Sequence, residues 1–70
     1  MQIEGSIRAN LIAAIASAKR LRGHPVHSDT IKYWRQLLDY ARRVSTQPQA
    51  EVFGDLMVEL ETELTHSKAA

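Results

Sequence analysis

Four carboxylates recur at every fourth position in the C-terminal third of the chain. They are Glu51, Asp55, Glu59 and Glu63. Residues four apart share one face of a helix, so these side chains would form an acidic strip of like-charge neighbours. The sequence leaves three interpretations open: a solvated face, internal ion pairs with Arg8 and Lys19, or a docking strip for a basic partner.

Basic side chains dominate the first two thirds of the sequence. The candidate phosphate contacts are Arg20, Arg22, Lys32, Arg35, Arg42 and Arg43. Such groups bind nucleic acid because each neutralised phosphate releases counterions. Ordinary helix chemistry competes, since cations stabilise a helix C-terminus and Asp39 can pair with neighbouring arginines. A helix-turn-helix fits poorly, because the first helix is too long and the connector lacks a tight-turn pattern. Nucleic-acid binding is therefore an alternative and not the leading hypothesis.

The histidines and nucleophiles do not form a chemical site. His24 and His27 lie three residues apart near Asp29, but zinc requires three or four ligands and the chain has no cysteine. No catalytic triad order, glycine-rich phosphate loop or carboxylate pair in a pocket is visible. A bundle of this size is expected to lack a ligand cavity of ~300 Å³. We therefore predict a non-enzyme without metal, cofactor or small-molecule substrate.

These side chains are positioned by a first helix predicted at about residues 6–22. Its apolar residues follow a period of 3.6, namely Ile7, Leu11, Ala14, Ile15, Ala18 and Leu21. Gly23 can take the left-handed conformation that ends a helix, and Pro25 prevents continuation.

A second helix is predicted at about 29–44 and a third at about 48–66. Ser28 or Asp29 would cap the second helix, and Trp34 and Leu37 would lie in the middle of the core. Thr46 and Gln49 match a capping box at the start of the third helix, and Pro48 is tolerated in its first turn. The apolar face of this helix consists of Val52, Phe53, Leu56, Met57, Leu60 and Leu64. Gly54 would be a weak point inside this helix. No strand is predicted, and residues 67–70 are expected to fray.

The predicted fold is all-α, a three-helix antiparallel bundle with up-down-up connectivity, in which residues 1–70 form one domain. The chain shows no signal-peptide pattern. Its longest apolar run, Leu11–Ala16, is shorter than the ~20 residues that span a bilayer. We expect a cytoplasmic protein without a membrane partner.

Some apolar residues lie outside the predicted core stripes or at their edges, and these form the candidate partner interface. They are Ile12, Tyr33, Tyr40, Met57 and Val58. A 70-residue core supplies only about 3–5 kcal/mol, which favours a homodimer. The leading hypothesis is a small protein-interaction module, a regulator or adaptor that docks a helix face to a partner protein. The alternatives are a nucleic-acid-binding protein that uses the basic residues of the first two helices, and a purely structural self-assembling subunit.

Overall fold

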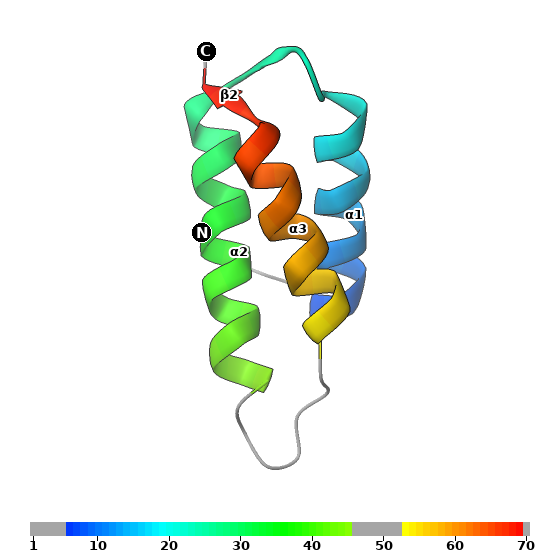
Figure 1. The fold of residues 1–70 in the computed structure, drawn as a ribbon. Helices are drawn as coiled ribbons and strands as arrows, with labels where there is room; N and C mark the ends of the chain where they lie inside the picture. The colour runs from blue at the N-terminus through cyan, green and yellow to red at the C-terminus, as the bar shows by residue number, and fades with distance from the viewer. Residues whose placement is uncertain (1–5, 46–52, 70) are drawn as a thin grey trace.

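A computed structural model describes residues 6–45 and 53–69 of the chain as three packed helices (Figure 1). The elements in chain order are α1 (Ile7–Arg20), β1 (Pro25–Val26), α2 (Ser28–Ser45), α3 (Gly54–His66) and β2 (Lys68–Ala69). Figure 1 shows α1 and α3 running in the same direction and α2 running against both. The predicted three-helix antiparallel bundle is confirmed.

Helix α1 begins after Ser6, whose side chain accepts a hydrogen bond from the Ala9 amide at 3.4 Å. It ends at Arg20, two residues before the predicted end. The reason is a tighter turn, in which the Arg22 amide donates to the Lys19 carbonyl at 3.2 Å. Gly23 follows with φ of 86°, so its predicted left-handed conformation is confirmed.

Helix α2 begins at Ser28, one residue earlier than predicted. His27 caps it instead of Ser28 or Asp29, because its Nδ1 accepts a hydrogen bond from the Asp29 amide at 3.1 Å. The His27 carbonyl accepts the amides of Thr30 and Ile31 at 3.0 and 3.2 Å. His27 is therefore the N-cap of α2, a position that serine or aspartate usually occupies.

Helix α3 begins at Gly54, so this glycine is its first residue and not an interior weak point. Phe53 precedes the helix with φ of −110° and ψ of 24°, and its side chain is buried. The prediction that the helix already includes Phe53 is wrong, because this side chain belongs to the core without being helical. The predicted start at Pro48 lies outside the described residues.

After α3 the chain pairs with the connector between α1 and α2. Strands β1 and β2 are parallel, with Pro25 opposite Lys68 and Val26 opposite Ala69. The predictions of no strand and of a frayed end are wrong for Lys68 and Ala69, and residue 70 lies outside the described residues. Segments of two residues are too short to show the alternation that reveals strands in a sequence.

The core contains one fully buried leucine from each helix: Leu11, Leu37 and Leu60. Trp34 is also buried, as predicted, and Val26 reaches the core from the connector. No helix in residues 6–45 or 53–69 is long and apolar enough to cross a membrane.

Candidate functional site

Two of the four residues of the acidic strip, Glu59 and Glu63, form ion pairs inside the molecule. The Lys19 ammonium lies 2.5 Å from Glu59, and the Arg22 guanidinium binds Glu63. These pairs form because α1 and α3 run side by side in the same direction (Figure 1). Asp55 is exposed, and Glu51 lies outside the described residues.

Glu63 is the one charged side chain that is buried in the described part of the chain, at 3% exposure. Both of its carboxylate oxygens accept hydrogen bonds from Arg22, one of them from Nε at 3.1 Å. A two-point guanidinium–carboxylate contact compensates the cost of removing the carboxylate from water. Glu63 is therefore neither a solvated residue nor an accessible docking residue.

Arg42 makes a third set of contacts with acidic groups. Its Nη2 lies 2.6 Å from an oxygen of Glu61, and its Nη1 lies 3.7 Å from an oxygen of Asp39. Sequence reasoning missed Glu61, because it is two residues from both Glu59 and Glu63 and so points to the other flank of α3. That flank faces α2. The place of Glu61 in the sequence, on the flank opposite the acidic strip, is the feature from which its contact with α2 could have been predicted.

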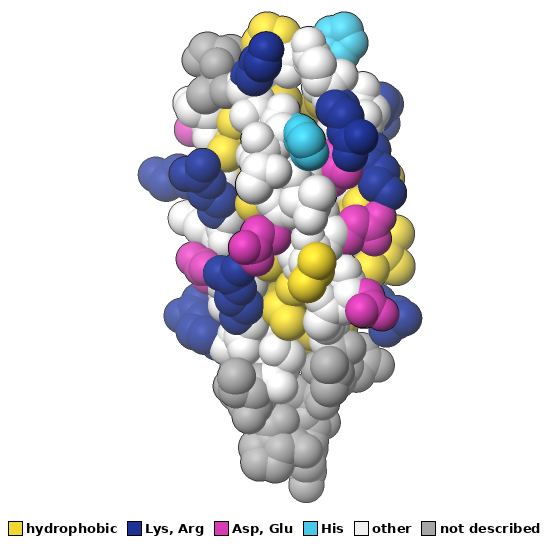
Figure 2. All heavy atoms as spheres, viewed as in Figure 1, with side chains coloured by type: hydrophobic (Ala, Val, Ile, Leu, Met, Phe, Trp, Pro, Cys, Tyr) yellow, Lys and Arg dark blue, Asp and Glu magenta, His cyan; other side chains and the backbone are white. Residues whose placement is uncertain are grey.

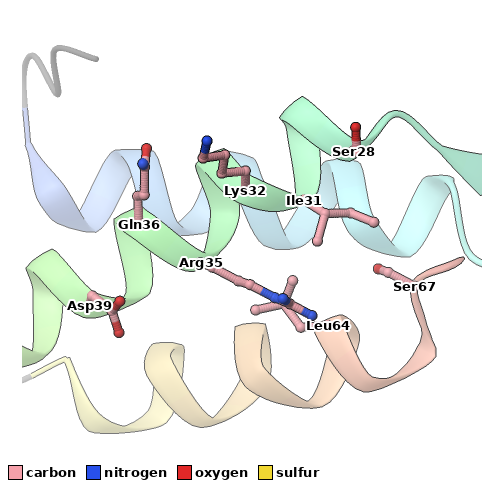
Figure 3. A pocket seen from close by; sticks show the side chains of 8 residues that line it. All are labelled: Ser28, Ile31, Lys32, Arg35, Gln36, Asp39, Leu64 and Ser67. Atoms are coloured by element: carbon pink, nitrogen blue, oxygen red, sulfur yellow. The ribbon is translucent and has the colours of Figure 1, made fainter. Parts of the chain in front are cut away.

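An open groove runs between α2 and α3, and we call it the α2–α3 groove (Figure 3). Its larger part has a volume of about 530 Å³ and an adjoining part has about 390 Å³. The larger part is lined by Ser28, Ile31, Lys32, Arg35, Gln36, Asp39, Leu64 and Ser67. Both volumes exceed ~300 Å³, but they belong to a groove that is open to solvent and not to the enclosed ligand cavity considered from the sequence.

The lining residues of α2 include a regular stripe, which we call the α2 stripe. It consists of Ser28, Lys32, Arg35, Asp39 and Arg42, at successive spacings of four, three, four and three. This spacing keeps side chains in one line along a helix. In Figure 3 the Arg35 side chain extends from α2 toward Leu64 on α3, whereas Lys32 and Gln36 extend away from α3. Leu64 is half-buried and packs against the core.

The six candidate phosphate contacts do not gather in one cluster. Lys32, Arg35 and Arg42 line the groove, and Arg22 is occupied by Glu63 between α1 and α3. Arg20 is exposed on α1, and Arg43 lies beside Arg42 in a shallow hollow on α2. Figure 2 shows basic side chains on both sides of α3 with acidic side chains between them.

The five candidate interface residues do not form one patch either. Residues two apart lie on nearly opposite flanks of a helix, so Tyr33 and Tyr40 face away from Arg35 and Arg42 and therefore away from α3. The remaining three are exposed Ile12 on α1, half-buried Met57 on α3 and exposed Val58 on α3. Val58 lies two residues before the fully buried Leu60, so it points outward from the bundle.

Among residues 6–45 and 53–69, no three His, Asp or Glu side chains are grouped so that they could hold a metal ion. His27 and Asp29 are in contact, but this contact caps α2. Comparison with known proteins finds no family model, no curated protein and no solved structure that matches this chain.

Proposed function

We propose that this chain is a small helical protein-interaction module, a regulator or adaptor, which docks a helix of a partner protein in the α2–α3 groove. The observation that carries this proposal is the α2 stripe beside Leu64. Every helix face has a spacing of four and three, but this face lines an open groove and has a half-buried leucine beside it. A helix held in a groove between two helices is a common mode of peptide recognition.

The length of the groove suits such a partner. From Ser28 to Arg42 the stripe extends for about 21 Å, at a rise of about 1.5 Å per residue. A partner helix of about four turns would contact the whole stripe. Leu64 on α3 offers the partner an apolar contact next to the polar residues of α2.

A photo-crosslinking residue placed at Gln36 in the source cells would identify the partner. Gln36 is exposed in the groove, and the matched control position is Ala13, which is exposed on α1. We expect one protein to be crosslinked from position 36 and not from position 13. The purified partner should then bind the unmodified chain.

A steric block separates groove binding from other contacts. Gln36→Tyr enlarges an exposed side chain at the rim of the groove, and this should weaken binding of the purified partner by about tenfold or more, about 1.4 kcal/mol. Ala13→Tyr adds the same side chain outside the groove and should leave the affinity unchanged. Equal affinity of the two variants would show that the partner binds elsewhere and would contradict the proposal.

Homodimer formation and a cytoplasmic location remain part of the proposal. The small core supports a self-associating chain, since one core of this size gives limited stability. Light scattering across a concentration series, together with circular dichroism, tests this part. We expect a dimer mass that falls on dilution, whereas a monomer mass at all concentrations would rule the homodimer out.

Nucleic-acid binding is the less favoured alternative. Arg22 and Arg42 already pair with carboxylates, and Asp39 lies within the α2 stripe. These contacts leave fewer cations for phosphate groups and place negative charge beside them. Binding of duplex DNA at low salt that weakens with Arg35→Gln would favour this alternative. A chain whose only partner is itself, a structural subunit, would instead dimerise and yield no other crosslinked protein.

A further inference from the structure

The α2–α3 groove has one positive end and one end where charges are balanced. At the balanced end, Arg42 contacts Glu61 at 2.6 Å and Asp39 at 3.7 Å. At the other end, Lys32 and Arg35 have no hydrogen-bond or ion-pair partner among residues 6–45 and 53–69. The larger part of the groove is therefore lined by these two cations and one carboxylate, Asp39, whereas Arg35, Asp39, Arg42 and Glu61 balance each other in the adjoining part.

The pairing of α3 explains why these two cations are left over. Three of its four carboxylates, at positions 59, 61 and 63, contact Lys19, Arg42 and Arg22, and the fourth, Asp55, is exposed. The contacts to Lys19 and Arg22 join α3 to α1, and the contact to Arg42 joins it to α2. No carboxylate of α3 contacts Lys32 or Arg35, although both line the groove beside Leu64.

We propose that the segment bound in this groove is an amphipathic helix with acidic residues beside an apolar stripe. Its carboxylates would face Lys32 and Arg35, and its apolar side chains would contact Leu64. This inference rests on the proposed function and adds the chemistry of the partner. Lys32 and Arg35 are three residues apart, so carboxylates spaced by three or four on a facing helix can reach both cations.

The groove also favours a peptide over a nucleic acid. A phosphate backbone carries negative charge along its whole length and would meet Asp39 and Glu61 in the same groove. An acidic helix can confine its carboxylates to the Lys32 end and place neutral or basic residues near Asp39 and Glu61. The groove therefore favours a partner helix that is acidic at the Lys32 end and neutral or basic at the end near Asp39 and Glu61.

Three synthetic peptides of about four to five helical turns test this inference with the full chain. The first has a leucine stripe flanked by glutamate, the second has the same stripe flanked by lysine, and the third has glutamate flanks with the leucines replaced by serine. Fluorescence anisotropy of labelled peptides gives the affinities, and a short DNA duplex is measured in the same way. We expect the glutamate–leucine peptide to bind at least about tenfold more tightly than each of the other probes, with weaker binding at high salt.

Charge reversal in the groove should reverse this order. Lys32→Glu with Arg35→Glu should weaken the glutamate–leucine peptide by about tenfold or more and strengthen the lysine–leucine peptide. The matched control is Arg8→Glu with Arg20→Glu, which changes the same charge on exposed positions of α1. This control should leave the order unchanged. All four positions are exposed, and circular dichroism checks that each variant keeps its helices.

The possible failures are distinguishable. If both leucine peptides bind equally and Gln36→Tyr blocks both, the docking function stands and the acidic partner is wrong. If neither leucine peptide binds, or if Gln36→Tyr changes nothing, the proposed function fails and the inference fails with it. Tighter binding of the serine peptide or of DNA would overturn the inference in favour of a polyanion site.

Discussion

At the scale of single residues, the contact between Arg22 and Glu63 is the most consequential polar interaction in the described part of the chain. Glu63 is buried, whereas the Arg22 side chain is about half exposed at 52%. Removing Arg22 should therefore destabilise the fold more than removing the charge of Glu63. An unpaired Arg22 can be hydrated, but an unpaired Glu63 would leave a charge in the core.

We predict that Arg22→Ala lowers the free energy of unfolding by about 1–3 kcal/mol, because it leaves the buried Glu63 carboxylate without its hydrogen-bond partner. Glu63→Gln should cost less, since the arginine that it leaves behind reaches water. Lys19→Ala should cost less than about 1 kcal/mol, because both groups of the Lys19–Glu59 pair are exposed. Urea titrations followed by circular dichroism measure all three variants. Equal losses for Arg22→Ala and Lys19→Ala would contradict the structural role given to Glu63.

A second prediction at this scale compares two valines. Val26 is 4% exposed and packs in the core from the connector, whereas Val58 is 65% exposed on α3. Val26→Ala should lower the free energy of unfolding by about 1–2 kcal/mol, through lost burial and a small cavity. Val58→Ala should change it by no more than about 0.5 kcal/mol. The same titrations compare the pair, and a larger effect at Val58 would mean that this residue is covered, as in a dimer.

At the scale of elements, the connector between α1 and α2 depends on its glycine. Gly23 has φ of 86°, and a Cβ added there would meet no atom within 4 Å. The cost of Gly23→Ala therefore comes from the backbone alone, and we predict about 1–2 kcal/mol. Gly23→Asn should cost less, because asparagine tolerates the left-handed conformation better. Thermal unfolding compares the two variants, and an alanine variant as stable as the unmodified chain would contradict the left-handed conformation of Gly23.

The sequence predicts α1 and α2 well and the start of α3 less well. Apolar periodicity locates α1 and α2 to within two residues, because burial of one face requires that spacing. The start of α3 is different. Phe53 fits the apolar period of the helix, but periodicity alone does not distinguish a buried residue inside a helix from one just before it. The cap at His27 and the pairing of Pro25–Val26 with Lys68–Ala69 depend on local hydrogen bonds that leave little trace in the sequence.

At the scale of the whole molecule, the acidic helix α3 packs against both basic helices, α1 and α2. The acidic residues Glu59, Glu61 and Glu63 of α3 form ion pairs with basic residues of α1 and α2, and these pairs join the three helices. What remains for a partner is the charge that this packing does not use. Part of that charge, Lys32 and Arg35, lines the α2–α3 groove, which is why we propose this groove as the docking surface.

The groove itself could be predicted only in part. Its cations Lys32 and Arg35 were among the candidate residues, because their charge and their place on the outer face of a helix are visible in the sequence. Their neighbours Leu64 and Ser67 come from α3, and their closeness depends on how the helices pack. Whether the acidic strip is paired or solvated also depends on that packing, since Arg22 meets Glu63 because α1 and α3 lie side by side.

The most direct measurement of the central claim is a pair of NMR amide spectra of the labelled chain, recorded with and without the glutamate–leucine peptide. We expect shifts at Ser28, Lys32, Arg35 and Leu64, whereas the amides of Tyr33 and Tyr40, on the far flank of α2, should be unchanged. A binding peptide that instead shifts the tyrosines, Ile12 or Val58 would contradict the claim that the α2–α3 groove is the docking site.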